Sequence, residues 1–217
     1  MEETAAAAAC AYHAHALGRG RGVKRPRPGR LGVFGGTFDP PHLGHLLLAE
    51  CAREALALDT VVFVPARVPP HRAPKRPLPA DVRVRLLRAA LHGTGFAIST
   101  LELSRPGPSY TVDTLDEMKK KHDDIWLLLG ADSLLDLPTW RDPDGILARA
   151  RLAVAARPGF PARRIPARVQ RRVDWLPNAP VDISSRDLRR RVADGRSIRF
   201  LVPDRVARLI ERLGLYR

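Results

Sequence analysis

The sequence predicts an α/β fold in which helices cover both faces of a parallel β-sheet. Short apolar runs at 31–34, 61–65 and 125–129 lack helical periodicity, as expected of strands that are buried on both faces of a sheet. Longer segments with a helical pattern separate these runs. Because this alternation is typical of parallel strands joined by crossover helices, we expect one α/β domain from residue 31 onward.

Length and composition agree with one globular domain. A chain of 217 residues can bury a substantial core, and 45% hydrophobic with 28% charged residues is ordinary for such a protein. No apolar run reaches the ~18 residues that a transmembrane helix needs, so no membrane association is expected. The two cysteines, Cys10 and Cys51, lack metal-binding spacing and indicate a reducing compartment, so we expect a cytoplasmic protein.

Residues 1–29 are predicted to be a disordered or foreign extension of the domain. An alanine-rich segment is followed by a tract of glycine, arginine and proline. A secretory signal would place basic residues before an apolar core, whereas here the acidic Glu2 and Glu3 come first. The net charge of +14 would suit nucleic acid or polyphosphate substrates equally, so charge alone does not decide between them.

A glycine-rich loop joins the first predicted strand to the first helix. Gly35 and Gly36 end the strand, and without a Cβ they let backbone N–H groups approach a ligand. His42 and His45 open a helix that continues through Ala57, and residues three apart on a helix face the same way. Because a helix N-terminus carries free N–H groups and about half a positive charge, the arrangement suits a phosphate.

Two other kinds of site would use similar residues. A metal site would need a third ligand near the histidines, such as a cysteine or the glutamate of HExxH, and this stretch has neither. A dinucleotide-binding loop would show GxGxxG spacing, whereas this loop reads GVFGGTFDP. An isolated histidine is usually structural or solvated, but a pair directly after a glycine-ended strand favours the phosphate site.

The segment after the second strand, residues 66–79, contains five prolines and several cations. It could be a solvated loop, or a loop that closes over substrate and brings cations such as Arg72 to a phosphate. The next helix is predicted at 81–91, where Arg83 is expected to be a solvated surface charge. The third strand is expected within 96–103, which alternates apolar and polar residues.

Polar residues at the starts of later helices are further candidates. Ser109–Thr111 opens a helix that runs to Lys121, either as an ordinary cap or with N–H groups presented to an anion. Asp132 follows the strand at 125–129 and could cap the next helix or hold a ribose hydroxyl. Trp140 lies near a proline, and its simplest role is packing.

The C-terminal part continues the alternation and holds a second candidate phosphate site. Strands are predicted at 151–156 and 173–176. Ser184 and Ser185 then offer N–H groups and hydroxyls at a helix N-terminus, with Arg189 about one turn further on. This site would face the histidine pair if both helices begin at the carboxyl edge of the sheet.

The string GVFGGTFDPPHLGH at 32–45 resembles the nucleotidylyltransferase superfamily, whose mark is an (H/T)xGH motif after a glycine-rich strand end. It is similar in particular to the bacterial nicotinate-nucleotide adenylyltransferases of NAD biosynthesis. Other motifs of that family are matched in the same order: PPHR at 69–72, PSYT at 108–111, GADS at 130–133, PTW at 138–140, RPG at 157–159, ISSRDLR at 183–189 and GLYR at 214–217. The match departs at Arg186, where threonine is usual, and no direct chemistry is expected of the GLYR end.

The resemblance implies a Rossmann-like fold of the nucleotidylyltransferase type over residues 31–217. It also implies adenylyl transfer from ATP to nicotinate mononucleotide, with deamido-NAD and pyrophosphate as products and Mg²⁺ arriving with the ATP. In such an enzyme the backbone of the SYT segment would help hold the nicotinate carboxylate. Trp140 would stack on the pyridine ring, and Asp132 would hold a ribose hydroxyl.

The residues expected to carry these roles form three groups, and none is expected to bind a metal. The residues expected in catalysis are His42, His45, Arg72 and Arg189. The residues expected to bind ATP are Gly35, Gly36, Thr37, Phe38, Gly130, Asp132, Ile183, Ser184 and Ser185. The residues expected to bind the nicotinate nucleotide are Ser109, Tyr110, Thr111, Trp140 and Arg157.

Three other functions fit the sequence less well. A related transferase acting on nicotinamide mononucleotide or phosphopantetheine is disfavoured by the SYT, PTW and RPG elements, which would lie where an acidic pyridine docks. A nucleic-acid-binding module would need a reading motif or interleaved aromatic and basic residues, and 31–217 shows neither. A binding protein with an inactive site is disfavoured because both phosphate sites are intact. The expected partners are therefore two nucleotides, and a homo-oligomer is compatible with the sequence.

Overall fold

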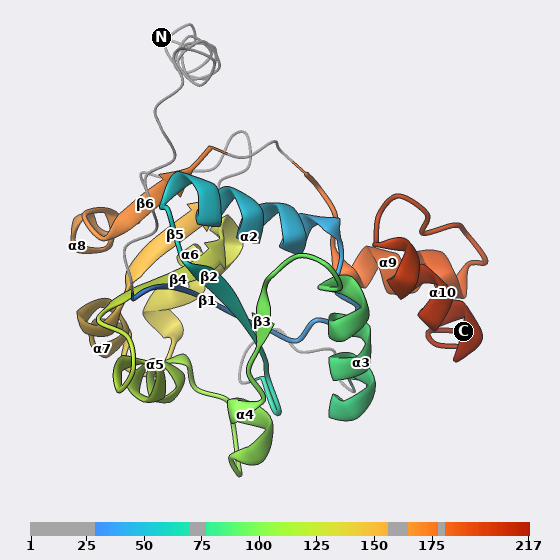
Figure 1. Cartoon of the computed structure of the whole chain (residues 1–217), viewed down its shortest axis with the longest axis horizontal. Coiled ribbons are helices and arrows are strands. Elements are labelled where there is room, and N and C mark those ends of the chain that lie inside the picture. Colours follow the sequence, from blue (N-terminus) through green and yellow to red (C-terminus); the bar gives the residue numbers. More distant parts are fainter. Residues whose placement is uncertain (1–28, 70–76, 156–164, 178–180) are drawn as a thin grey trace, which may run out of the picture.

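The computed structural model describes residues 29–69, 77–155, 165–177 and 181–217. Within these ranges, six strands form one sheet in the order β3-β2-β1-β4-β5-β6, and neighbouring strands pair in parallel (Figure 1). The strands are β1 (Arg30–Gly36), β2 (Thr60–Pro65), β3 (Ala97–Ile98), β4 (Asp124–Gly130), β5 (Arg151–Ala155) and β6 (Val173–Leu176). The predicted parallel α/β sheet is confirmed.

The helices follow the strands in the alternation that the sequence predicts. They are α2 (Leu43–Ala55), α3 (Ala80–Ala90), α4 (Leu101–Ser104), α5 (Thr111–Lys119), α6 (Ala131–Asp136), the 3₁₀ helix η1 (Leu137–Thr139), α7 (Pro143–Arg149), α8 (Ala167–Gln170), α9 (Ser185–Ala193) and α10 (Asp204–Arg212). None of the helices in the described part of the chain is long and apolar enough to cross a membrane.

The strand order creates a crevice at the middle of the sheet. The chain runs outward from β1 to β2 and β3, and then returns to the other side of β1 with β4. In open α/β sheets with this order, ligands bind beyond the carboxyl ends of the strands at the point where the direction reverses. Here that point lies between β1 and β4, which end in Gly36 and Gly130.

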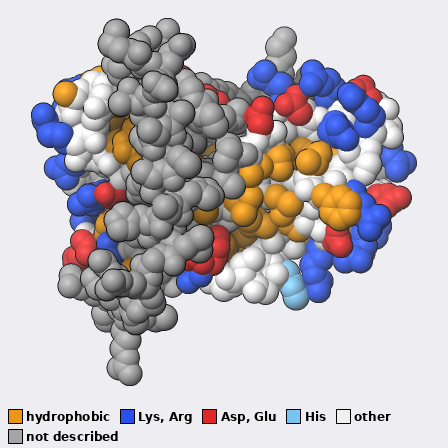
Figure 2. Space-filling model, turned by 90° about the horizontal axis from the view of Figure 1, so that it is seen from above, with side chains coloured by type: hydrophobic (Ala, Val, Ile, Leu, Met, Phe, Trp, Pro, Cys, Tyr) orange, Lys and Arg blue, Asp and Glu red, His pale blue; other side chains and the backbone are white. Residues whose placement is uncertain are grey.

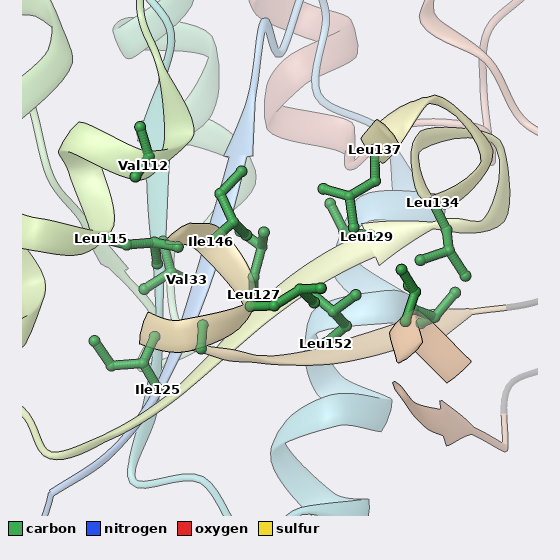
Figure 3. Close-up of a cluster of buried hydrophobic side chains, with 14 of the residues drawn as sticks. Val33, Val112, Leu115, Ile125, Leu127, Leu129, Leu134, Leu137, Ile146 and Leu152 are labelled. Atoms are coloured by element: carbon green, nitrogen blue, oxygen red, sulfur yellow. The ribbon is translucent and has the colours of Figure 1, made fainter. Parts of the chain in front are cut away.

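Alternate residues of β4 supply the two cores that lie on opposite faces of the sheet. Leu127 and Leu129 pack with α5, α6 and α7 on one face, in the cluster drawn in Figure 3. Trp126 and Leu128 pack with α2 on the other face. Because β4 is buried on both faces, its apolar run is continuous rather than alternating, which is the pattern that predicted a central strand.

A third apolar cluster joins three helices at one end of the molecule. Leu188 of α9 and Val206 of α10 pack with α3, and in Figure 1 these helices lie together beside the sheet. This packing brings the C-terminal part of the chain close to the loop that follows β1.

Figure 2, which views the molecule from the α2 side, shows a hydrophobic patch with basic side chains gathered toward the α9–α10 end.

The third predicted strand is much shorter than the segment 96–103 suggested. Only Ala97–Ile98 is a strand, and Leu101–Ser104 forms the short helix α4. The chain leaves the sheet after Ser99, whose N–H donates to the Phe63 carbonyl. The following turn buries Glu102, so tertiary contacts override the alternating pattern of this segment.

The predicted N-terminal extension remains a prediction, because residues 1–28 lie outside the described part of the chain. Gly29 is described, and its N–H donates to the carboxylate of Asp59 at 2.9 Å. The proline-rich segment is described only at its two ends, and the segment after β5 begins to be described again at Ile165.

We expect Leu115→Ala to lower the free energy of unfolding by about 2–5 kcal/mol, because Leu115 is fully buried in the α5 side of the core and its loss leaves a cavity. Urea denaturation measures this change. The matched control is Leu47→Ala on α2, where the side chain is 42% exposed and the expected change is about 0.5 kcal/mol. Equal losses in the two variants would contradict the assignment of the core.

Candidate active site

A cavity of about 180 Å³ opens at the carboxyl ends of β1 and β4, at the reversal point of the sheet. One wall is the end of β1 with Gly36 and Thr37, and another is Gly130 at the end of β4. Ser109 and Trp140 line the cavity as well. The structure therefore brings together residues from the predicted ATP set and the predicted nicotinate set.

The two histidines stand at the N-terminus of α2, as predicted. His42 is the N-cap residue, and its backbone N–H donates to Nδ1 of His45 at 3.1 Å. The two imidazole rings stack with their centroids 3.7 Å apart and their planes 27° from parallel. Because Nδ1 of His45 accepts this hydrogen bond, the neutral ring carries its proton on Nε2.

Gly44, between the histidines, leaves room for the His42 ring. A Cβ at this position would lie 3.1 Å from Nδ1 of His42, which is tighter than ordinary contact. The same Cβ position is 3.9 Å from the carbonyl oxygen of Ile183, just before α9. The glycine of the HxGH motif thus lets one histidine lie against the helix while α9 approaches from the other side.

Burial keeps His45 neutral. Its ring packs against Phe34 and Phe38, with ring centroids 5.7 and 5.2 Å away. This burial, together with the neighbouring His42, lowers the pKa of His45 well below its ordinary value of 6.5. A neutral imidazole with its proton on Nε2 can donate a hydrogen bond to a phosphate oxygen without titrating near neutral pH.

The ring of Phe38 packs inside the protein rather than facing a nucleotide. The side chain is 2% exposed, its ring meets those of Phe34 and Phe63, and it would contact a Cβ placed on Gly36. Its backbone adopts the left-handed conformation, with φ of 51°, which is costly for an aromatic residue. Any contact of Phe38 with ATP would therefore come from its backbone.

Residues 37–42, called here the histidine loop, are held by side chains from distant segments. Arg83 of α3 donates to the carbonyl of Thr37 at 2.9 Å, and it also donates to Leu78. Arg83 is only 1% exposed, so the expectation of a solvated surface charge is wrong. Arg189 of α9 donates to the carbonyl of Asp39 at 2.6 Å, which brings this predicted catalytic residue to the loop.

The N-terminus of α9 lies beside the histidine loop, so the two predicted phosphate sites do adjoin each other. The hydroxyl of Ser185 donates to the carbonyl of Pro40 at 2.8 Å. The hydroxyl of Ser184 accepts from the N–H of Asp187 and donates to its carboxylate. Both hydroxyls and the N–H of Asp187 are thus engaged within the protein, and the N–H groups of Ser185 and Arg186 are the first-turn donors of α9 that suit an anion.

The first turn of α2 is also partly occupied. The N–H of Leu43 donates to the carbonyl of Leu201, and the N–H of His45 donates to the carbonyl of His42. The backbone of this turn therefore contributes less to an anion site than the sequence suggested. The imidazole rings and the guanidinium of Arg189 are the other candidate donors to an anion at this end of the loop.

Ser109 serves mainly to shape the wall of the cavity. Its hydroxyl accepts from the N–H of Arg67 at 2.9 Å, and its own N–H donates to the carbonyl of Val68 at 2.9 Å. These bonds join the loop after β2 to the SYT segment. Thr111, the first residue of α5, also lines the cavity. The N-terminus of α5 is therefore the feature of this segment that suits an anion.

The aromatic residues of the predicted substrate site have different positions. Trp140 lines the cavity and packs against the apolar core, and its stacking on a pyridine ring remains a prediction. Tyr110 packs against the same core, and the guanidinium of Arg141 lies 4.5 Å over its ring. Asp132 is exposed in the first turn of α6, next to Gly130.

Glu102 is a cavity residue that the sequence did not single out. It is 6% exposed, and its carboxylate accepts a 2.6 Å hydrogen bond from the hydroxyl of Thr114. Burial raises the pKa of Glu102, while hydrogen bonds from Thr114 and Ser109 and the charge of Arg105 oppose the shift. No local signal marks this glutamate, because its partner Thr114 lies on another helix and Ser109 lies in the segment before that helix.

Arg72 and Arg157, predicted for catalysis and for the nicotinate nucleotide, lie outside the described residues. Their roles remain predictions. Within the described ranges, no three His, Cys, Asp or Glu side chains gather in a way that could hold a metal ion.

A Rossmann-like sheet order, with the HxGH helix start at its reversal point, is the arrangement of a nucleotide-binding α/β protein. Residues 33–191 match the family model described as cytidylyltransferase-like. The chain is 47% identical over 197 residues to a probable nicotinate-nucleotide adenylyltransferase of Thermomicrobium roseum, with 87% of this chain and 92% of that protein covered. It is 45% identical over 195 residues to the protein of the same name from Thermus thermophilus, with 87% and 100% covered. The chain therefore belongs to the cytidylyltransferase-like family and, within it, to the nicotinate-nucleotide adenylyltransferases.

Solved structures show the same fold at low identity. One is the Plasmodium falciparum nicotinic acid mononucleotide adenylyltransferase complexed with NaAD. It has a TM-score of 0.71 and 16% identity, with 87% of this chain and 97% of that chain covered. A second structure of that protein, complexed with APC, has a TM-score of 0.70 with the same identity and coverage. The predicted fold of the nucleotidylyltransferase type is confirmed.

The lowered pKa of His45 predicts a pH-dependent stability. The unfolded chain regains a His45 pKa of about 6.5, so it binds the proton more readily than the folded protein does. This contribution to stability is full above about pH 6.5 and is lost as the pH falls toward the folded pKa. His45→Asn should therefore show a smaller loss of unfolding free energy between about pH 7.5 and about pH 5 than the wild type.

Urea denaturation at each pH measures this difference. The asparagine Oδ1 can still accept from the His42 N–H, so the N-terminus of α2 keeps its hydrogen bond. His92→Asn, at an exposed residue, controls for the removal of an imidazole as such. A pH dependence in His45→Asn as steep as that of the wild type would contradict the lowered pKa.

Proposed function

We propose that this chain transfers the adenylyl group of ATP to nicotinate mononucleotide, forming deamido-NAD and pyrophosphate. The observation that carries the proposal is the packing of His45 against Phe34, a residue that lines the cavity at the reversal point of the sheet, with the α9 N-terminus held against the same histidine loop. The other wall of that cavity holds Thr111 and Trp140, which suit an acidic pyridine ring. Relatives at 45% and 47% identity carry the name of this activity.

The reaction needs no protein nucleophile. A phosphate oxygen of the nicotinate nucleotide forms a bond to the α-phosphorus of ATP, while the bond from that phosphorus to the bridging β-phosphate oxygen breaks. The electron pair of the broken bond leaves with pyrophosphate. Because the attacking group is already an anion, the chain has to position the two nucleotides and stabilise the charge that moves to the leaving group.

His45 and Arg189 suit the stabilising role. The Nε2–H of neutral His45 would donate to a phosphate oxygen from a ring that is held in place against Phe34 and Phe38. Arg189 uses one nitrogen for the Asp39 carbonyl, and the remaining N–H groups of its guanidinium can bind phosphate. Arg72 would add a second cation from the segment after β2.

Mg²⁺ is expected to enter with the phosphates of ATP and to neutralise part of their charge. The described carboxylates nearest the histidine loop are already engaged. Both oxygens of Asp39 accept hydrogen bonds, from Tyr216 and from the Leu78 N–H. The donor set therefore suits an ion carried by the substrate rather than one held by a protein cage.

The nicotinate end of the substrate would meet the start of α5. The N–H and hydroxyl of Ser109 are engaged with the loop after β2, so the N–H groups of the first turn, beginning with Thr111, remain the suitable donors for a carboxylate. Trp140 would provide the flat apolar surface for the pyridine ring. An uncharged amide would gain less from a helix N-terminus than a carboxylate does.

The decisive assay is pyrophosphate release from ATP and Mg²⁺ with nicotinate mononucleotide, and then with nicotinamide mononucleotide. We expect kcat/KM to be at least about 10-fold higher with the acid, which corresponds to about 1.4 kcal/mol from the anion site. Equal values would contradict the proposed carboxylate site but keep adenylyl transfer. No release with either nucleotide would overturn the proposed function.

His45→Asn should lower kcat by about 100-fold or more, because it removes a donor to the phosphate that changes charge while keeping the hydrogen bond from His42. Pyrophosphate release under saturating substrates measures kcat. His92→Asn is the matched control and should keep wild-type turnover, since His92 is exposed and lies outside the cavity. Wild-type kcat in folded His45→Asn would contradict the role given to this histidine.

A further inference from the structure

The penultimate residue of the chain reaches the histidine loop. The hydroxyl of Tyr216 donates to Oδ1 of Asp39 at 2.6 Å, across 177 positions of sequence. Asp39 is 2% exposed, and its other oxygen accepts from the N–H of Leu78 at 3.2 Å. This contact is one that neither the sequence pattern nor the proposed reaction explains, because Tyr216 does not line the cavity.

The end of α10 is shaped to deliver this tyrosine. Gly214 has a left-handed φ of 59°, and its N–H donates to the carbonyl of Glu211. The N–H of Leu215 donates to the carbonyl of Ile210, which completes a Schellman C-cap. Tyr216 is itself left-handed, with φ of 65°, a conformation that a non-glycine residue keeps only when its surroundings hold it.

The electrostatic surroundings fix the direction of the hydrogen bond. Burial raises the pKa of Tyr216 strongly, and the hydrogen bond to Asp39 and its charge raise it further. The cations of Arg189 and Arg83 oppose this shift without cancelling it. The phenol therefore keeps its proton and acts as a donor, while the carboxylate of Asp39 acts as the acceptor.

Asp39 lies three residues before His42, in a loop whose other polar groups are also held. Its carbonyl accepts from Arg189, the carbonyl of Pro40 accepts from Ser185, and the carbonyl of Thr37 accepts from Arg83. These three bonds hold the backbone. The carboxylate of Asp39 is the side-chain anchor of the same loop, and the hydrogen bond from Tyr216 is shorter than the one from the Leu78 N–H.

We infer that Tyr216 is a positioning residue for adenylyl transfer, which holds the histidine pair in place through its hydrogen bond to Asp39. This inference rests on the proposed function, because the loop that it steadies carries the groups assigned to the phosphates. Tyr216 does not touch substrate. It makes the last turn of the chain part of the support of the active site.

The first test compares Tyr216→Phe with the wild type in the pyrophosphate-release assay. The ring stays in place and only the hydroxyl is lost. We expect kcat to fall about 10- to 100-fold, as for small displacements of catalytic groups, with KM for nicotinate mononucleotide changed less than about 2-fold. We expect kcat to change more than KM because Tyr216 contacts the histidine loop and not the wall that holds Thr111 and Trp140. Arg217→Ala, at the exposed neighbouring residue, should behave as wild type.

A second measurement separates positioning from a loss of stability. In Tyr216→Phe, we expect faster hydrogen exchange of the backbone N–H groups at 37–45, with unchanged exchange in α5. In the His45→Asn background, Tyr216→Phe should lower kcat by less than about 2-fold. The reason is that Tyr216 is proposed to act by positioning His45, and that imidazole is already absent. Additive effects, or a lower melting temperature with wild-type kcat and wild-type exchange, would overturn the inference.

The two proposals can fail separately. If the wild type releases no pyrophosphate from ATP with either pyridine nucleotide, the proposed function fails. Hydrogen exchange in Tyr216→Phe would still decide whether the C-terminal residue steadies the histidine loop. If the wild type is active and Tyr216→Phe matches it in both kcat and exchange, only the inference about Tyr216 fails.

Discussion

The buried polar groups of the histidine loop impose the main constraint on this structure. The loop lies between β1 and α2, so the carbonyls of Thr37, Asp39 and Pro40 and the Asp39 carboxylate are not paired within a sheet or a helix. Groups buried in this way need donors from elsewhere. The donors come from Arg83, Ser185, Arg189 and Tyr216, on α3, on α9 and after α10. The third apolar cluster packs these helices together, and so it also assembles the support of the loop.

The packing of the histidine pair also determines which groups of the site are neutral and which are charged. Two imidazole rings stacked 3.7 Å apart would repel each other if both were cations, and the aromatic surroundings of His45 already disfavour its charged form. The ring is therefore suited to act as a neutral hydrogen-bond donor. The guanidinium of Arg189 and the N-terminus of α9 are the groups beside the histidine loop that can supply positive charge.

Much of the fold could be predicted because its signals are local. Apolar runs, the glycines that end β1 and β4, and the Ser184 cap of α9 each depend on a few neighbouring residues. Arg83, Glu102 and Tyr216 could not be placed in this way. Each is buried against partners from another part of the chain, and an arginine in a helix or a tyrosine near a terminus has the same local pattern when it is solvated. Tertiary contacts, rather than propensity, decide the positions of such residues.

The histidine loop and the Ser109 wall of the cavity are supported by different segments of the chain. The proposed chemistry and the proposed binding of the pyridine ring therefore depend on different parts of the fold. The histidine loop is held by α3, α9 and Tyr216, whereas the wall of the cavity at Ser109 depends on the bonds that join this residue to the loop after β2. Glu102 belongs to that wall. An ionised glutamate there would repel an anionic ring substituent, and burial shifts this carboxyl toward its neutral form. Loss of the hydrogen bonds from the hydroxyls of Thr114 and Ser109 would favour the neutral form of Glu102 further. The charge of this wall therefore depends on the hydrogen bonds that Glu102 accepts.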